Sequence, residues 1–267
     1  MLDLKVIHAN GKEIKSKLSL STFPLAIKMA KDENDIPKDA IRPFRDNGYH
    51  LDNCQAFSMS RRGQKTVAMT KEDMWCMAPF IAFGFVEPSE EWLKGKHRGL
   101  LGINPEAREK AVQSAPRFKV GKYMGIISAP LEKCSFEPDL FIIYCDDPYQ
   151  LTHILVAKDC IDGEDITSIF AGHCSCLRTV VPVLQKRKCW IVSPGRGERQ
   201  NALTQNNEVI FSAPIEILGD FIKAFRYLEE HGQHIPFGLE LDPNRKLKNG
   251  YADIGRTMGI PYDGVTN

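Results

Sequence analysis

The spacing of apolar and polar positions divides the chain into segments that predict both helices and strands. Residues 1–20 place lysines on one side of a helical repeat and apolar side chains on the other, which predicts an amphipathic helix. Residues 23–30 form a short apolar run and are expected to be a strand. The polar stretch 31–47, rich in Asp, Pro and Lys, is expected to be a surface loop.

Capping residues mark the helices of the rest of the first half. Asp52 and Asn53 can cap a helix, and Asn104 followed by Pro105 can open another. Residues 70–73 match the capping-box pattern. The expected elements here are helices over 54–61, 70–83 and 104–114 and a strand over 66–69.

The second half continues the mixture of helix and strand. Its expected strands are 123–131, 140–145, 188–192 and 207–213, and its expected helices are 147–158, 165–184 and 215–231. The pattern predicts an α/β or α+β fold with a mixed sheet flanked by helices. Residues 1–231 would be one domain and 232–267 an irregular tail. A division into two similar lobes stays open, because a cysteine-bearing helix, a basic turn and a strand occur in both halves.

Composition and charge narrow the class of protein. The 267 residues are 43% hydrophobic and 26% charged, which is ordinary for a globular protein. With 35 basic and 34 acidic residues the net charge is +1, which argues against a nucleic-acid surface. The charged amino terminus lacks the apolar core of a signal peptide, and the longest uncharged run, 74–86, is too short to span a bilayer. We therefore expect a cytoplasmic homo-oligomer that contacts neither membrane nor nucleic acid.

The eight cysteines are the main chemical feature of the chain. Disulfides rarely persist in the cytoplasm, so these residues are interpreted as free thiols, metal ligands, catalytic groups or small buried apolar residues. Cys134, Cys145 and Cys160 lie in ordinary apolar segments and are expected to pack. The remaining five are candidate ligands for an iron–sulfur cluster or another thiolate-bound metal: Cys54, Cys76, Cys174, Cys176 and Cys189.

Helix geometry limits what two of these candidates can do together. Positions i and i+2 of a helix point about 200° apart, so Cys174 and Cys176 can serve one site only in a loop or at a helix terminus. The preceding Gly172 and His173 make a terminus plausible. The alternative is that one thiol faces the core and the other the solvent. No Cys-x-x-Cys pair occurs in the sequence, which disfavours a zinc finger or ribbon.

Two residues are candidates for catalysis. Imidazole titrates near neutrality, so His173 could shuttle protons or bind a metal, although it could equally be an ordinary polar residue. Cys54 follows a predicted helix start, where the dipole can lower a thiol pKa. The carboxylate of Asp52 would oppose that shift.

Two basic, glycine-containing segments could hold an anion. Arg62 lies beside Gly63, and Arg196 and Arg199 lie in the stretch that follows the strand predicted at 188–192. Arginine offers bidentate bonds to carboxylate or phosphate, which makes these three the candidate residues for a small anionic substrate or cofactor. Exposed turns kept soluble by charge are the alternative. No P-loop, dinucleotide fingerprint or nucleophile elbow is present.

Short motifs across the chain resemble one protein family. The stretch from Cys54-Gln55-Ala56-Phe57 through Thr70-Lys71-Glu72-Asp73 to Phe83-Gly84-Phe85, with the later Asn207-Glu208-Val209, is similar to the uncharacterised ArCR family. That family is a domain of unknown function from archaea and anaerobic bacteria. The resemblance spans roughly residues 20–225. It implies an α/β domain with recurrent cysteines and implies no reaction.

Three hypotheses follow from these residues. The leading one is an oxygen-sensitive metalloprotein, or a redox or metal-dependent enzyme, acting on a small anionic substrate. The second is a metal-free binding module for a small anion or cofactor. The third is a thiol enzyme with Cys54 as nucleophile. The observation that would best distinguish these hypotheses is whether the fold brings Cys54 and Cys76 within metal-ligand distance of the cysteines from Cys174 to Cys189.

Overall fold

The computed structural model describes residues 3–96, 102–233 and 249–259, in two units. The first unit is Met1–Ile235 and the second is Pro236–Asn267. In the second unit, α11 (Asn249–Thr257) is a helix, so the irregular tail expected from the sequence contains regular structure. Everything that follows concerns the first unit.

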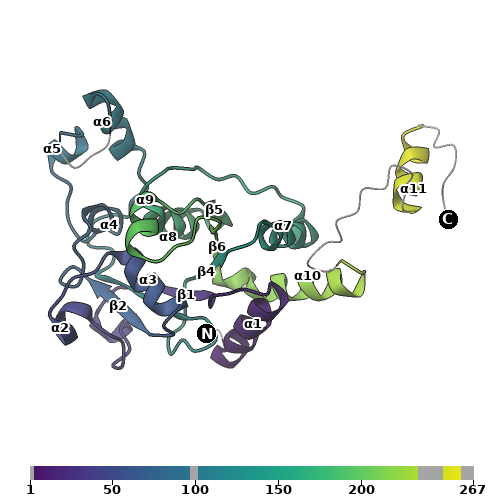
Figure 1. Ribbon diagram of the computed structural model, residues 1–267, viewed down its shortest axis with the longest axis horizontal. Coiled ribbons are helices and arrows are strands. Elements are labelled where there is room, and N and C mark those ends of the chain that lie inside the picture. The colour runs from purple at the N-terminus through teal and green to yellow at the C-terminus, as the bar shows by residue number, and fades with distance from the viewer. Residues whose placement is uncertain (1–2, 97–101, 234–248, 260–267) are drawn as a thin grey trace. The chain divides into compact units, whose positions relative to one another are not determined.

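Six strands of the first unit form one sheet (Figure 1). Their order is β2-β3-β1-β4-β6-β5, and every pairing between them is antiparallel. The α+β class is therefore confirmed, whereas the mixture of parallel and antiparallel strands is not found among them. Both halves of the chain contribute strands to this sheet instead of forming separate lobes. The strands are β1 (Leu25–Ala30), β2 (Val67–Thr70), β3 (Gly125–Pro130), β4 (Leu140–Cys145), β5 (Trp190–Val192) and β6 (Val209–Pro214).

Helices cover both faces of the sheet, which explains why nearly every strand residue is buried. One face, here called the packing face, carries α1 (Leu4–Lys17), α7 (Pro148–Asp162) and α10 (Leu218–Glu230). Phe221 of α10 lies at its centre. The ring centroid of Phe221 is 5.5 Å from that of Phe211 and 6.2 Å from that of Phe141.

The other face, here called the cavity face, carries α3 (Asn53–Arg61), α4 (Met77–Ala82) and α8 (Ser175–Lys186). Phe57 of α3 and Val180 of α8 pack on strands β1 to β4 and β6 as part of one apolar cluster. The short helix α9 (Arg196–Asn201) contacts α3. The remaining short elements are η1 (Glu33–Asp35), α2 (Pro43–Asn47), α5 (Glu90–Leu93), α6 (Pro105–Gln113) and η2 (Ile215–Ile217).

The capping box predicted at 70–73 is wrong, and a tertiary contact explains why. Thr70 is the last residue of β2, and its backbone N–H donates to Asp73 Oδ2 over 3.0 Å. The same carboxylate accepts from the Arg42 guanidinium over 2.6 Å. This buried group fixes a turn, so the following helix begins only at Met77.

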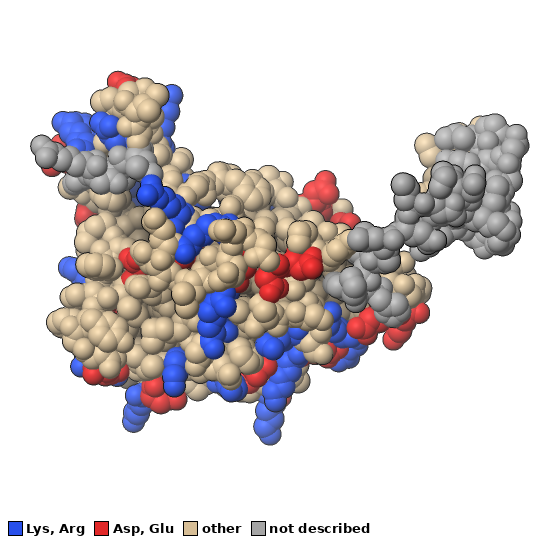
Figure 2. All heavy atoms as spheres, viewed as in Figure 1, with Lys and Arg blue, Asp and Glu red and all other residues tan. Residues whose placement is uncertain are grey.

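Other departures concern where helices begin. Residues 165–174 are irregular, and the helix predicted over 165–184 starts at Ser175. The loop predicted over 31–47 contains η1 and α2. Basic and acidic side chains are both spread over the face of the described residues that Figure 2 shows. Within the described ranges, no helix has the length and apolar character that a membrane span requires.

Candidate ligand-binding site

A cavity of about 400 Å³ lies on the cavity face, lined by the first turn of α8, by helix α4, and by residues of α5, α6 and the stretch 115–117. Pockets of this volume hold small molecules. Most of the lining is apolar, with two arginines, four cysteines, a histidine and two carboxylic acids among it. The lining residues are Asp52, Cys54, Cys76, Met77, Ala78, Pro79, Ile81, Ala82, Trp92, Ala111, Val112, Ala115, Pro116, Arg117, His173, Cys174, Ser175, Cys176, Leu177, Arg178, Gly197 and Glu198.

Four of the five candidate cysteines line this cavity. Cys54 belongs to α3, and Cys76 is the N-cap residue of α4. Cys174 is the N-cap residue of α8, and Cys176 lies in the first turn of that helix. The two halves of the chain therefore do bring their thiols together. The Cys174/Cys176 pair shares the site because it lies at a helix terminus, the condition set by helix geometry.

A close backbone contact fixes this terminus. Cys174 has a positive φ of 54°, in the left-handed region that non-glycine residues rarely adopt. A Cβ atom at Gly195 would lie 2.9 Å from the His173 Cα atom, so only glycine permits this approach. The Gly195 N–H also donates to Ser175 Oγ over 3.2 Å. The segment before α9 thus holds the start of α8 in place.

Of the four cavity cysteines, Cys54 and Cys176 are buried and Cys76 and Cys174 are partly buried. Burial raises the pKa of Cys54, Cys174 and Cys176, and it raises the pKa of Cys76 to about 12. The carboxylates of Glu198 and Asp52 raise the pKa of Cys54 further, so the start of α3 does not produce a thiolate. Within the described residues, no group of three or more His, Cys, Asp or Glu side chains is arranged to hold a metal ion.

The fold separates the other cysteines from the cavity. Cys189 lies in the apolar cluster of the packing face together with Cys134 and Cys145. Burial raises its pKa to about 11. The packing expected of Cys134 and Cys145 is confirmed. Cys160 was also expected to pack, but it is exposed on α7.

The three arginines predicted to hold an anion do not line the cavity. Arg62 donates to the Leu203 carbonyl oxygen over 3.0 Å and to Glu208 Oε1 over 3.3 Å. Arg199 donates to the carbonyl oxygens of Gln205 and Glu208. Arg196 is exposed at the start of α9, because the predicted basic turn is helical from that residue on.

The more deeply buried of the two arginines that line the cavity is Arg178, in the first turns of α8. The residue is only 4% exposed, and its Nε atom is buried without a hydrogen-bond partner. Among the described residues no acidic group pairs with it, whereas Arg61 and Arg42, equally buried, are both paired. Burial lowers the pKa of Arg178, but an arginine in a protein stays charged at neutral pH.

Two further features add positive potential beside Arg178. The Cys174 side chain makes no capping hydrogen bond, so the first N–H groups of α8 are not satisfied by the N-cap residue. Arg117, half-buried after α6, also lines the cavity. A sequence signal for Arg178 existed. It is a single arginine within the apolar run 176–183, at a position where helical spacing predicts burial.

Glu198 belongs to a buried hydrogen-bond network behind the cavity wall. Its carboxyl group accepts from the Tyr144 hydroxyl over 2.6 Å and from the Ser175 hydroxyl. Burial raises the pKa of Glu198. The Arg61 guanidinium lies 3.9 Å from the centre of the Tyr144 ring and pairs with Glu208 at 2.5 Å and 3.0 Å. This network links α3, α8, α9 and β4 and so fixes the positions of these elements around the cavity.

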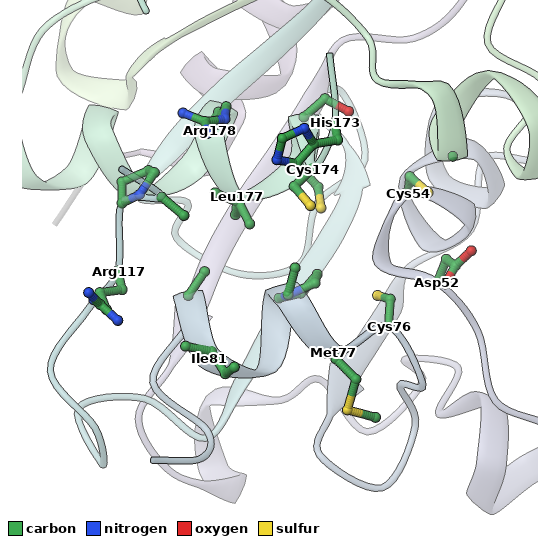
Figure 3. A pocket seen from close by; sticks show the side chains of 18 of the residues that line it. Asp52, Cys54, Cys76, Met77, Ile81, Arg117, His173, Cys174, Leu177 and Arg178 are labelled. Carbon is green, nitrogen blue, oxygen red and sulfur yellow. The ribbon is translucent and has the colours of Figure 1, made fainter. Parts of the chain in front are cut away.

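The two arginines and two of the four thiols occupy opposite ends of the cavity (Figure 3). Arg178 and Arg117 lie at one end, and Cys54, Cys76 and Asp52 lie at the other. Apolar side chains, among them Leu177 and Ile81, lie between the two ends. His173, whose pKa burial and the Arg178 charge lower, lies next to Cys174. The cavity can therefore discriminate between the two ends of a ligand.

Fold and site together define an α+β protein with a polarised cavity on one face of an antiparallel sheet. The chain belongs to the uncharacterised ArCR family, whose sequence pattern matches residues 13–224. The resemblance found in the sequence is thereby confirmed. All the residues that line the cavity lie within the matched range.

A curated relative supports the same assignment. The chain is 26% identical over 233 residues to the uncharacterized protein MJ0308 of Methanocaldococcus jannaschii, which covers 86% of this chain and 97% of the relative. No solved structure matches the chain.

Proposed function

We propose that this protein binds a small anionic ligand in the cavity, with the anion on Arg178. The observation that carries the proposal is Arg178 in the cavity wall, a buried arginine whose Nε atom has no hydrogen-bond partner and with which no acidic group of the described residues pairs. The ligand class is the one expected from the sequence, but the residues that hold it are different. Arg178 and Arg117 take the role expected of Arg62, Arg196 and Arg199.

The physical argument rests on the cost of an uncompensated buried charge. A charge removed from water is strongly destabilising unless a counter-charge or hydrogen bonds compensate it. An anion in the cavity would supply both to Arg178, through charge-assisted bonds of the kind arginine makes with carboxylate and phosphate. The uncapped N–H groups at the start of α8 would contribute in the same direction.

The experiment compares anion binding by the natural protein and by Arg178→Gln. Isothermal titration with inorganic phosphate, sulfate and butanoate as separate probes should detect binding of at least one of them. We expect Arg178→Gln to weaken that binding at least tenfold. Arg196→Gln is the matched control, because Arg196 is exposed and outside the cavity. Equal binding by all three proteins would overturn the proposal.

A second candidate is a soft metal ion or iron–sulfur cluster at the thiol end, as part of a redox or metal-dependent enzyme. Four thiols from three segments line one cavity, and thiolates are the ligands that such metals prefer. Against it, the described residues contain no group of three or more His, Cys, Asp or Glu side chains arranged to hold a metal ion. A bound metal would also have to deprotonate thiols whose pKa burial raises.

Anaerobic purification separates the two candidates. Stoichiometric iron and a visible absorption band, both lost in Cys76→Ser, would support the metal site. A colourless, metal-free protein that still binds an anion through Arg178 would leave only the first candidate.

We also propose that the protein acts in the cytoplasm as a homo-oligomer. All eight cysteines are free thiols in the structure, which suits a reducing compartment. Light scattering coupled to size-exclusion chromatography tests the oligomeric state, with a mass of 30.1 kDa expected for a monomer and a multiple of it for the oligomer.

A further inference from the structure

We infer that the ligand is an amphiphilic monoanion: one anionic group at the end of an apolar chain or ring. This inference rests on the proposed function and narrows it from any small anion to a chemical class. It follows from the polarised lining of the cavity, in which cations occur at one end and apolar side chains continue from there toward the thiols.

The first step is the wall beyond Arg178. Ile81 of α4 and Leu177 of α8 lie between the two ends of the cavity (Figure 3), and Ala82 of α4 and Val112 of α6 also line it. None of these side chains can bond to a polar ligand group. A hydrophilic ion such as sulfate would fill only the arginine end, whereas a hydrocarbon body would remove this apolar lining from water.

The second step is the thiol end. With their pKa raised by burial, Cys54, Cys76 and Cys176 are neutral at pH 7 and behave as small, polarisable apolar groups. The thiol end therefore continues the apolar wall and adds no cation to it.

The third step excludes a second anionic group on the ligand. Asp52 lies at the thiol end, and both oxygens of Glu198 already accept hydrogen bonds from Tyr144 and Ser175. A carboxylate reaching this end would meet like charge and no free donor from these two acids. The lining thus favours an anion at one end of the ligand only.

A series of straight-chain monocarboxylates tests the inference. Titration of butanoate, hexanoate, octanoate and decanoate should give affinities that rise about three- to fourfold per added methylene, the equivalent of ~0.8 kcal/mol for each buried CH₂. The rise should stop where the cavity is full. Octanedioate, with a carboxylate at each end, should bind at least tenfold more weakly than octanoate.

Two variants shorten the apolar part of the cavity from different walls. Ala78→Leu on α4 and Ala115→Leu after α6 both place a larger side chain at a half-buried lining position. Each should weaken octanoate binding at least tenfold more than it weakens butanoate binding. Retained butanoate binding also shows that the variant is folded.

The outcomes distinguish a failure of this inference from a failure of the proposed anion site. If the affinity depends on Arg178 but does not rise with chain length, the ligand is not an amphiphile, and the proposed anion site is still supported. The same holds if octanedioate binds as tightly as octanoate. If long carboxylates bind equally well to Arg178→Gln, the anion site itself is wrong.

Discussion

The two faces of one sheet are built from the same kinds of residue and do different things. On the packing face, helices α1, α7 and α10 cover the strands with a continuous cluster that includes four neighbouring phenylalanines. On the cavity face, a space of about 400 Å³ stays open at the start of α8. Cys189 and Cys176 are both buried, yet the first only packs while the second lines the cavity. The role of a cysteine here depends on the face that carries it.

The largest effect is expected on the packing face. Phe221→Ala removes a ring that three other phenylalanines surround, and we expect the free energy of unfolding to fall by about 3–5 kcal/mol. Urea denaturation measures it. Anion affinity of the folded fraction should not change. A change in affinity would show that packing on one face of the sheet affects binding on the other.

A somewhat smaller loss is expected from a buried ion pair of the cavity face. Arg61→Met leaves Glu208 buried and without its main partner, which should cost about 3 kcal/mol. We place it at the low end of the range for such variants because Arg62 still lies 3.3 Å from Glu208.

The exposed pair of Arg187 and Glu216 supplies the control. Arg187→Met should cost less than about 1 kcal/mol, because solvent screens that pair. Equal losses in Arg61→Met and Arg187→Met would contradict the view that the buried network holds the cavity walls.

A smaller, pH-dependent effect is expected at Glu198. Because burial raises its pKa in the folded state, folded protein binds this proton more tightly than unfolded protein does. The stability of the natural protein relative to Glu198→Gln should therefore fall as pH rises from about 4.5, the ordinary value, through the raised pKa. Urea denaturation at several pH values checks this. A difference independent of pH would show that folding does not raise the pKa of Glu198.

The smallest perturbation is chemical labelling of the folded protein. Brief treatment with iodoacetamide at pH 7, followed by peptide mass spectrometry, should modify the exposed Cys160 first. Cys54, Cys76 and Cys176 should react slowly, because burial raises their pKa. Faster labelling of Cys54 than of Cys160 would favour the thiol-enzyme hypothesis instead.

Elements whose signals are local could be predicted from the sequence. The apolar run of β4 and the capping residue Asp147 before α7 give nearly the observed elements. The helix expected to begin at residue 70 begins later, because Asp73 pairs with Arg42. This partner is distant in the sequence, so no local signal reveals it. The antiparallel order of the strands has no local signal either, since it depends on pairings between remote segments.

The candidate site could likewise be predicted only in part. Four of the five candidate cysteines do meet, but nothing local shows that Cys189 belongs to the opposite face. The arginines were chosen for neighbouring glycines and exposed turns, whereas the relevant Arg178 lies inside an apolar helix. Whether a buried arginine has a partner is a property of the fold, so only the structure identifies it as unpaired.

We propose that the cavity binds an anion through Arg178. The most direct test is isothermal titration of octanoate into the natural protein, Arg178→Gln and Arg196→Gln. We expect the natural protein and Arg196→Gln to bind with equal affinity and Arg178→Gln to bind at least tenfold more weakly. Equal affinity in all three proteins, or no binding to any of them, would show that Arg178 does not hold an anion in this cavity.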